Sequence, residues 1–543
     1  MTGRARGSRR ILAGVLIAVP VIATSVGLYF ARTHEVPVRG GVITEGVVID
    51  SSNGTGFSLL PAFADAPPAL DVASLLYRGL TGTGPDGRPR PGLATKWEVD
   101  AAVKKFTFHL RAGLKWSDGV ALTSADALYT LRVLQDAALG RSQVGQAWSG
   151  VTAGAPDPLT VVYSLPAPSA GFVNLTRTGL LPEHTLKART VASLRDTTDA
   201  PTSGPFRVRS LARDLVALRR NSRSFEPPWL DGIDLRLFTN TGAALQAFLA
   251  GDIDTLAGLS PADGSQVASA INRRLLSAGS FAYTELLFNQ KQPALSDGKV
   301  RTAINEAVDR RGLIQGQLMG FGRLDASPIP PAITWAAASS RGLALDRGAA
   351  AKTLDASGWR RAGIGRIRQK DGVELRLHLT AATTGVYSRV ARSIAADLTV
   401  VGVGVNLELV SDADLLAKLQ ARNFEMALTA LDNGPDPDIY VLWHSSQSAA
   451  GGFNFSGMPA DAFLDKDLED GRFNYDIKTR RAAYLDAQKI LRADQPAAFL
   501  YSPDLVVAFN NRLHGVRLNP AMETTGRYDF VSGWYLNTQR VWK

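Results

Sequence analysis

The sequence predicts an α/β fold in which helices cover a sheet, and three observations carry that prediction. Helical and strand patterns alternate through the second half of the 543-residue chain. Hydrophobic residues make up 45% and charged residues 20% of the sequence, which is typical of a packed globular protein. At roughly 150 residues per domain, the length corresponds to about three or four domain-sized units.

The first forty residues combine an arginine cluster with an apolar segment. Residues 1–39 have a charge balance of +5, half of the net charge of +10. Residues 11–30 contain no charge and, at about 1.5 Å per residue, can span a hydrocarbon core of about 30 Å. The preceding arginines should stay in the cytoplasm, so the globular part should lie outside it. We expect an uncleaved signal anchor. The alternative is a cleaved signal that leaves a secreted or periplasmic protein.

Charge and cysteine content exclude several functions. The remaining 504 residues carry a mild +5 with no basic stripe, which argues against a nucleic-acid partner. The chain has no cysteine. Disulfides, cysteine-bound zinc, thiol nucleophiles and a lipidated N-terminal cysteine are therefore excluded.

The elements of the first half follow from residue period and capping. Residues 40–65 are rich in Gly, Ser and Val, which indicates a strand and loops. Residues 106–111 alternate apolar and polar side chains, as a half-buried strand does. Thr123 and Asp126 form a capping-box pattern, and leucines within 128–134 share one face of the helix that follows.

Three helix patterns in the second half contain the apolar stripes 300–308, 390–398 and 484–491. The first begins after Asp297 and should end at the Gly- and Pro-rich loop 320–331. A strand pattern follows each of the other two, at 403–410 and 497–500.

No residue pattern supports catalysis. Gly82, Gly84 and Gly87 match a GxGxxG spacing, but prolines follow at once, so a turn is expected rather than a nucleotide-binding helix. Ser296 and Lys299 match SxxK, which a helix cap explains better. The six histidines are widely separated. We predict no catalytic residue, no metal site and no cofactor.

One acidic segment is a candidate binding site. Asp432-Asn433-Gly434-Pro435-Asp436-Pro437-Asp438 directly follows the apolar strand 426–431. Carboxylates at a strand end can receive an ammonium group through charge-assisted hydrogen bonds. A solvated acidic turn explains the pattern equally well, and a calcium loop is disfavoured because the EF-hand spacing is absent.

Several sequence segments, which occur in the same order along the chain, resemble segments of a known protein family. FTFHLRAGLKWSDG (106–119) and LTSADALYTL (122–131) are the strongest, and weaker runs lie at 75–80, 92–99, 202–208, 248–254, 286–289, 300–310, 327–331, 482–491 and 496–501. Together they resemble the extracytoplasmic solute-binding proteins of family 5, the oligopeptide, dipeptide and nickel-chelate binders of ABC importers. The resemblance covers nearly the whole chain after residue 40.

The resemblance implies a two-lobed periplasmic-binding-protein-like clamp of type II with an extra domain on the first lobe. The implied ranges are 40–67, 200–284 and 502–543 for the first lobe, 68–199 for the extra domain and 285–501 for the second lobe, with residues 1–39 as tail, anchor and linker. Strand crossings near 285–289 and 499–504 would form the hinge.

The resemblance also implies a ligand site. Asp432, with Asn433 and Gly434, would bind the ligand's α-ammonium group. Ala430 and Leu431 would line the same wall, and Asp65, Ala66 and Pro67 would face them from the first lobe.

Two departures from the family pattern bear on the ligand. Pro435 resembles an insertion relative to the dipeptide binders. The stretch 380–387 is uncharged where those proteins carry a carboxylate-pairing arginine; Ala381 sits near that place, and Arg389 is the nearest cation. An unpaired carboxylate in a closed cleft is costly, so a dedicated dipeptide binder is disfavoured. A longer peptide with a solvated C-terminus fits better, and a non-peptide cation remains open.

The expected function is therefore that of a non-enzymatic, monomeric substrate-binding protein that captures oligopeptides for an ABC permease. Since a lipidated cysteine is absent, residues 11–30 would have to supply any tether. The alternatives are a non-peptide solute such as a metal chelate, siderophore, sugar or antibiotic, or a receptor that no longer transports. An exported hydrolase is a further alternative, for which no catalytic triad or metal site can be assembled.

Overall fold

The computed structural model describes residues 33–49, 58–64, 67–139, 142–340, 344–361, 363, 365–449, 451–520 and 522–542. The predicted anchor, residues 11–30, lies outside these ranges. Within them, no helix combines the length and the apolar character that a membrane crossing requires.

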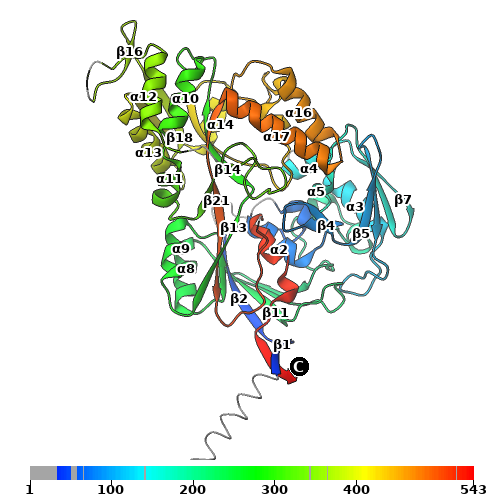
Figure 1. Cartoon of the computed structure of the whole chain (residues 1–543). Helices are drawn as coiled ribbons and strands as arrows, with labels where there is room; N and C mark the ends of the chain where they lie inside the picture. The colour runs from blue at the N-terminus through cyan, green and yellow to red at the C-terminus, as the bar shows by residue number, and fades with distance from the viewer. Residues whose placement is uncertain are drawn as a thin grey trace, which may run out of the picture.

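A long strand, β21 (Ala497–Asn510), joins the two halves of the main sheet (Figure 1). In the described residues this sheet has twelve strands in the order β19-β18-β20-β14-β21-β12-β2-β11-β10-β9, and β13 and β15 also pair with β21. Up to Tyr501, β21 pairs with β14 (Ala282–Phe288); from Asp504 onward it pairs with β13 (Arg273–Gly279). The strand therefore changes partners within three residues.

One half of the sheet contains the early strands. They are β2 (Val42–Val48), β9 (Phe206–Ala212), β10 (Leu215–Arg220), β11 (Gly232–Phe238) and β12 (Thr255–Ala257). β11 and β12 both pair with β2 in parallel. Two helices, α8 (Thr241–Ala250) and α9 (Pro261–Ala268), pack with β12 and β21 in one apolar core.

The other half has a separate core on each face. Its strands are β14, β15 (Gly322–Leu324), β18 (Arg376–Ala382), β19 (Gly404–Val410) and β20 (Met426–Asp432). One core includes α10 (Gly298–Ala307), α11 (Arg310–Gln317), α12 (Arg347–Ala356) and α13 (Tyr387–Val400). The opposite core includes α14 (Asp412–Gln420), α15 (Tyr440–Trp443), α16 (Ala462–Phe473) and α17 (Ile477–Asp494). Leu286 packs in the first core and Leu287 in the second, as strand alternation requires.

A further unit is built on a four-stranded antiparallel sheet. The sheet has the order β5 (Ala94–Val99), β6 (Lys105–Leu110), β8 (Thr160–Ser164) and β7 (Thr152–Asp157). Beside it are the hairpin β3 (Thr81–Thr83) and β4 (Pro89–Pro91) and the helices α2 (Pro67–Leu76), α3 (Ser124–Leu134), α4 (Gln143–Ala147), α5 (Phe172–Leu175), α6 (Glu183–Leu186) and α7 (Val191–Leu194). Its core is continuous with that of the first half of the main sheet.

The remaining elements are short or peripheral. They are β1 (Thr33–Val38), β16 (Gln369–Lys370), β17 (Val373–Glu374), β22 (Asn537–Trp542) and the 3-10 helices η2 (Pro61–Phe63), η3 (Ser445–Gln447), η4 (Thr524–Tyr528) and η5 (Val531–Gly533). β1 and β22 form an antiparallel pair outside the main sheet.

Several local predictions are confirmed. The alternating run is β6, and Thr123 and Asp126 form a complete capping box at the start of α3. The glycines at 82–87 lie in the β3–β4 hairpin. The predicted α/β class also holds.

Two boundaries differ from the prediction. The helix expected from Asp297 to the 320–331 loop is divided, because the backbone at Val308 is extended and Asp309 caps a second helix, α11. The strand expected at 497–500 continues to Asn510. Pro503 does not end the strand, because it lies where the strand changes partners and its missing N–H is tolerated there.

Candidate functional site

The acidic loop, residues 432–438, follows β20 and contains three aspartates in different environments. Asp436 forms an ion pair with Arg480 of α17 at 2.6 Å. Asp438 pairs with Arg472 of α16 at 3.3 Å. Two of the three carboxylates are therefore neutralised by arginines of the helices packed behind the loop.

Asp432 has no ion pair among the described residues. One of its oxygens accepts a hydrogen bond from the backbone N–H of Gly434 at 2.8 Å, which closes a tight turn. Gly434 has a φ of 67°, a left-handed conformation that glycine adopts at little cost. The turn therefore orients the Asp432 carboxyl while leaving its other oxygen available.

Two charged residues from other parts of the chain face this turn. Arg177 follows α5, Glu523 precedes η4, and they form an ion pair at 2.5 Å. A Cβ atom built on Gly434 would lie 3.6 Å from Glu523 Oε1 and 3.9 Å from Arg177 Nη2. The unit containing α5 and the C-terminal segment thus meet the acidic loop.

The charges around Asp432 favour a cationic ligand. Asp432 retains exposed surface, but neighbouring protein atoms exclude enough water to raise the pKa of its carboxyl. The Gly434 N–H and the Arg177 guanidinium lower that pKa, and the Glu523 carboxylate raises it. Because Arg177 is shared with Glu523, the three side chains together carry a net charge of −1 when ionised, and an ammonium group would complete their neutralisation.

The structure brings together only part of the predicted site. Ala430 and Leu431 lie on β20 immediately before Asp432, and Asn433 and Gly434 lie in the turn after it. Asp65 and Ala66 lie outside the described residues. Pro67 begins α2, but the placement of its side chain is also outside the described part. The predicted first-lobe side of the site therefore stays a prediction.

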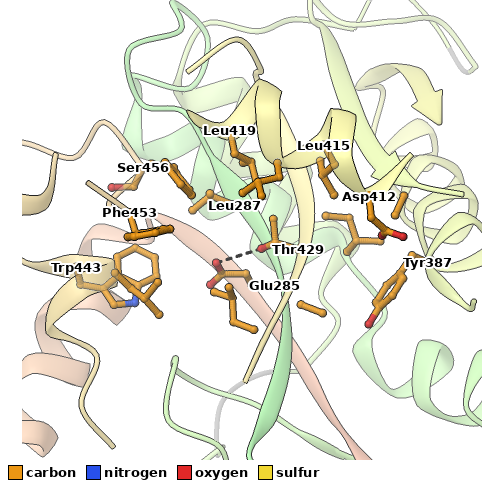
Figure 2. A pocket seen from close by; sticks show the side chains of 17 residues that line it. Glu285, Leu287, Tyr387, Asp412, Leu415, Leu419, Thr429, Trp443, Phe453 and Ser456 are labelled. Carbon is orange, nitrogen blue, oxygen red and sulfur yellow. Dashed lines mark hydrogen bonds between the residues drawn. The ribbon is translucent and has the colours of Figure 1, made fainter. Parts of the chain in front are cut away.

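A cavity of about 350 Å³ lies beside β20 (Figure 2). It is lined by Glu285, Leu287, Ala382, Tyr387, Asp412, Leu415, Leu416, Leu419, Leu428, Thr429, Ala430, Leu431, Leu442, Trp443, Phe453, Phe455 and Ser456. The paired strands β14 and β20 run along it, and α14 covers it. Ser411 caps α14, and its leucines at 415 and 419 are one turn apart and point inward.

Glu285 is the buried acid of this cavity. Its side chain is only 2% exposed, and its Oε1 accepts a hydrogen bond from the Thr429 hydroxyl at 3.3 Å. Its Oε2 has no hydrogen-bond partner in the part of the chain that the structure describes. Burial raises the pKa of this carboxyl to about 8.

Glu285, Arg177 and Glu523 are not predicted from the sequence as candidate site residues. Glu285 carries a usable signal, because it is a single acid within the otherwise uncharged strand 282–288. No sequence signal identifies Arg177 and Glu523, because they are 346 positions apart and come together only in the folded chain.

The residues near the place where dipeptide binders carry a carboxylate-pairing arginine lie away from the cavity. Ala381 is buried in the core beneath α13 and does not line the cavity. Arg389 donates a hydrogen bond to Gln317 at 3.3 Å and also lies outside the cavity lining. Among the described residues that line the cavity there is no lysine or arginine.

The described residues also contain no group of three or more histidines and acids that could hold a metal ion. In the acidic loop, Asp436 and Asp438 are instead paired with arginines.

Comparison with known proteins identifies relatives along most of the chain. A family model described as bacterial extracellular solute-binding proteins, family 5 middle, matches residues 88–453. Protein XP55 of Streptomyces lividans is 27% identical over 87% of this chain and 88% of its own length. Oligopeptide-binding protein AppA of Bacillus subtilis is 25% identical, with 92% of each chain covered.

Solved structures show the same two-lobed fold. AppA of B. subtilis in complex with a nonapeptide superposes with a TM-score of 0.67 at 23% identity, covering 92% of this chain and 100% of AppA. The murein tripeptide-binding protein MppA in its unliganded open form gives a TM-score of 0.78 at 20% identity, covering 94% and 99%.

Proposed function

The chain belongs to the bacterial extracellular solute-binding proteins of family 5, the substrate-binding components of ABC importers, and from that membership we propose that it captures oligopeptides and delivers them to a membrane permease. Its homologues bind substrates and do not convert them. AppA, which shares nearly the full length of this chain, is named for oligopeptide binding and was solved with a nonapeptide.

Asp432 is the observation that carries the peptide proposal. It is the one aspartate of the acidic loop without an arginine partner among the described residues, and its turn holds it where three parts of the chain meet. A peptide's α-ammonium group would bind there, with Asn433 and Gly434 shaping the turn and Ala430 and Leu431 forming the adjacent wall. Asp65, Ala66 and Pro67 are proposed to contact the ligand from the opposite side.

Capture is proposed to occur by closure of the lobes around the ligand. We assign residues 40–67, 200–284 and 502–543 to the first lobe, 68–199 to the extra domain and 285–501 to the second lobe. The change of partners in β21 between residues 501 and 504 supports a hinge at the 501/502 boundary. The other crossing, the β13–β14 turn at residues 280–281, lies a few residues before the 284/285 boundary and before the range 285–289 expected from the sequence. A ligand that contacts both lobes stabilises the closed state, because the open state lacks half of those contacts.

The test uses the full-length chain in detergent and a peptide library read by thermal unfolding. A peptide at about 100 times its dissociation constant should stabilise the protein by about 2.7 kcal/mol. We expect Asp432→Asn to weaken the binding of peptides with a free N-terminal amine at least tenfold. The substitution should not lower the unfolding temperature of the unliganded protein. Asp214→Asn, in the exposed β9–β10 turn, is the matched control and should change neither.

Two results would contradict the peptide proposal. N-acetylated peptides that bind as tightly as free ones would remove Asp432 from ammonium recognition. The second result is that no peptide stabilises the protein and native mass spectrometry identifies a co-purified metal chelate, sugar or other solute. The ligand would then be that solute and not a peptide.

We further propose that residues 11–30 anchor a monomeric binding protein to the outer face of the cell membrane. The support is the uncharged length of this segment, the arginines before it and the absence of cysteine. The full-length chain should remain in membranes after carbonate washing and keep Met1 at its N-terminus. A soluble protein with a shortened N-terminus would establish a cleaved signal instead.

A further inference from the structure

The cavity beside β20 is apolar on most of its surface and has one buried acid. Leu287, Leu415, Leu419 and Leu431 form its aliphatic walls, and aromatic residues form one end. Its volume of about 350 Å³ falls at the lower end of the range for small-molecule sites, roughly 300 to 1,000 Å³. The space is sufficient for one side chain or one small organic molecule.

Glu285 has no cation to neutralise it within the described structure. Lysine and arginine side chains close in sequence to the cavity-lining residues have other partners. Lys418 of α14 pairs with Glu408 at 2.9 Å. Arg422 stacks on Phe455 with its guanidinium carbon 4.4 Å from the ring centroid and donates to the backbone carbonyls of Ser448 and Gly452.

A buried carboxyl with a free oxygen is costly in a folded protein unless something pairs with it. Figure 2 shows the Glu285 carboxyl between the two strands, directed toward Thr429 and the space beneath α14. The Thr429 hydroxyl donates a hydrogen bond to Oε1, and Oε2 has no partner among the described residues. A ligand in the cavity can supply a partner for this oxygen.

We propose that this cavity binds an organic cation with an apolar body, whose ammonium or guanidinium group pairs with Glu285 and whose stem lies against the leucines. A lysine or arginine side chain of a bound peptide has this chemistry, and so does a free alkylamine. The assignment to a peptide side chain rests on the proposed function; the cavity chemistry does not.

Three features favour a cation over a neutral or anionic group. Asp412 adds a second acid at the cavity, and no lysine or arginine belongs to the described lining. Trp443 and Phe453 supply aromatic rings whose faces attract cations. A carboxylate entering the same space would find no lysine or arginine in the described lining to pair with.

The position of the cavity suits a peptide held at Asp432. Glu285 pairs with Thr429 across the strands, and Asp432 lies three residues further along β20. At about 3.3 Å per residue this separation is about 10 Å, the length of three extended peptide residues. A basic side chain of a peptide held at Asp432 would have to span this distance to enter the cavity.

The test measures binding by calorimetry to the full-length protein and its Glu285→Gln variant. The probes are pentaalanine peptides in which each position in turn is lysine, arginine, norleucine or glutamate, together with n-hexylamine and hexan-1-ol. At one position we expect lysine or arginine to bind at least tenfold more tightly than norleucine. In Glu285→Gln this preference should disappear, with the norleucine peptide unchanged or tighter.

Asp432→Asn separates this proposal from the proposed function. This substitution should weaken the binding of all the peptides by the same factor and preserve the preference for the basic residue. Since glutamine has the shape of glutamate without its charge, the unfolding temperature of Glu285→Gln should not fall below that of the unsubstituted protein.

The possible outcomes distinguish failure of the cavity proposal from failure of the peptide function. Peptides that bind with no preference for a basic residue, or a preference that survives Glu285→Gln, would overturn the cavity proposal and leave the peptide function standing. Hexylamine that binds more tightly than hexanol only when Glu285 is present, with no peptide binding, would uphold the cavity and overturn the peptide function. No binding of any probe would overturn both.

Discussion

Glu285 and Asp432 are both acids with raised pKa values, but water reaches them differently. Asp432 keeps exposed surface at the end of β20, whereas Glu285 is almost fully buried in the middle of β14. The buried acid must ionise for a cation to pair with it, so proton release accompanies that binding.

The protonation of Glu285 should make stability depend on pH. Its pKa is about 8 in the folded protein against 4.5 for the ordinary side chain, so the folded state holds this proton more tightly than the unfolded chain. The stability linked to this group is complete below pH 4.5 and is lost as the pH rises to about 8. Glu285→Gln should therefore become more stable relative to the unsubstituted protein between pH 5 and pH 8, by a few kcal/mol at about 1.4 kcal/mol per pKa unit.

Urea unfolding of both proteins at pH 5 and pH 8 measures this difference. Tyr283, Tyr387, Asp412 and Asp325 lie around Glu285 or its strand and are present in both proteins. Glu374→Gln, on the exposed strand β17, serves as the control and should show no such trend. A difference between the two proteins that is the same at both pH values would show that Glu285 titrates normally.

Among the elements, a buried ion network ties together three segments that are far apart in sequence. Arg527 of η4 donates to Glu45 of β2 at 2.8 Å and to Asp71 of α2 at 2.7 Å, and all three are buried. Tyr528 adds a hydroxyl that accepts from Arg527 at 2.7 Å. The network holds η4 and the C-terminal segment against α2, on the side that presents Glu523 to the acidic loop.

Arg527→Met should destabilise the protein by roughly 3 to 5 kcal/mol, because it leaves two buried carboxylates without a cation. Denaturant unfolding measures this change. Arg376→Met removes an exposed pair with Glu374 and should cost less than about 1 kcal/mol. Equal effects of the two substitutions would mean that water reaches the buried network.

At the scale of elements, the sequence predicts what depends on neighbouring residues. The period of 106–111 and the caps at Thr123 and Asp297 are local features, and the structure contains all three. The division between α10 and α11 escapes prediction because Val308 continues the apolar stripe while its backbone leaves the helix. The candidate site can be predicted where its residues are contiguous, at 430–434. It cannot be predicted at Arg177 and Glu523, which are distant in sequence.

In the whole molecule, the unit built on the four-stranded sheet also contacts the helices behind the acidic loop. Asn174 donates to Asp436 at 3.1 Å, and the Trp97 indole donates to the Tyr475 hydroxyl at 2.6 Å. The backbone N–H of Ala170 donates to the carbonyl of Arg472 at 2.9 Å. These contacts connect regions that we assign to different lobes.

The double variant Asn174→Ala and Trp97→Phe should shift the lobes toward separation. Two cross-contacts of about 1 kcal/mol each correspond to a loss of roughly tenfold or more in ligand affinity, with a larger radius of gyration in solution. Small-angle scattering and calorimetry measure the two effects. Asp436 keeps its pair with Arg480, so the acidic loop itself should remain intact. Unchanged scattering and affinity would show that these contacts do not bias the lobe positions.

The continuity of β21 has a consequence for how the chain is made. Residues 497–510 supply a strand to both halves of the main sheet. In addition, β1 pairs with β22, which is synthesised last among the strands. A polypeptide synthesised from its N-terminus cannot complete either half until more than nine-tenths of it has emerged. Non-local pairings of this kind form slowly. The protein must therefore pass through a long stage in which sheet edges are open, and its yield should depend on whatever shields those edges during export.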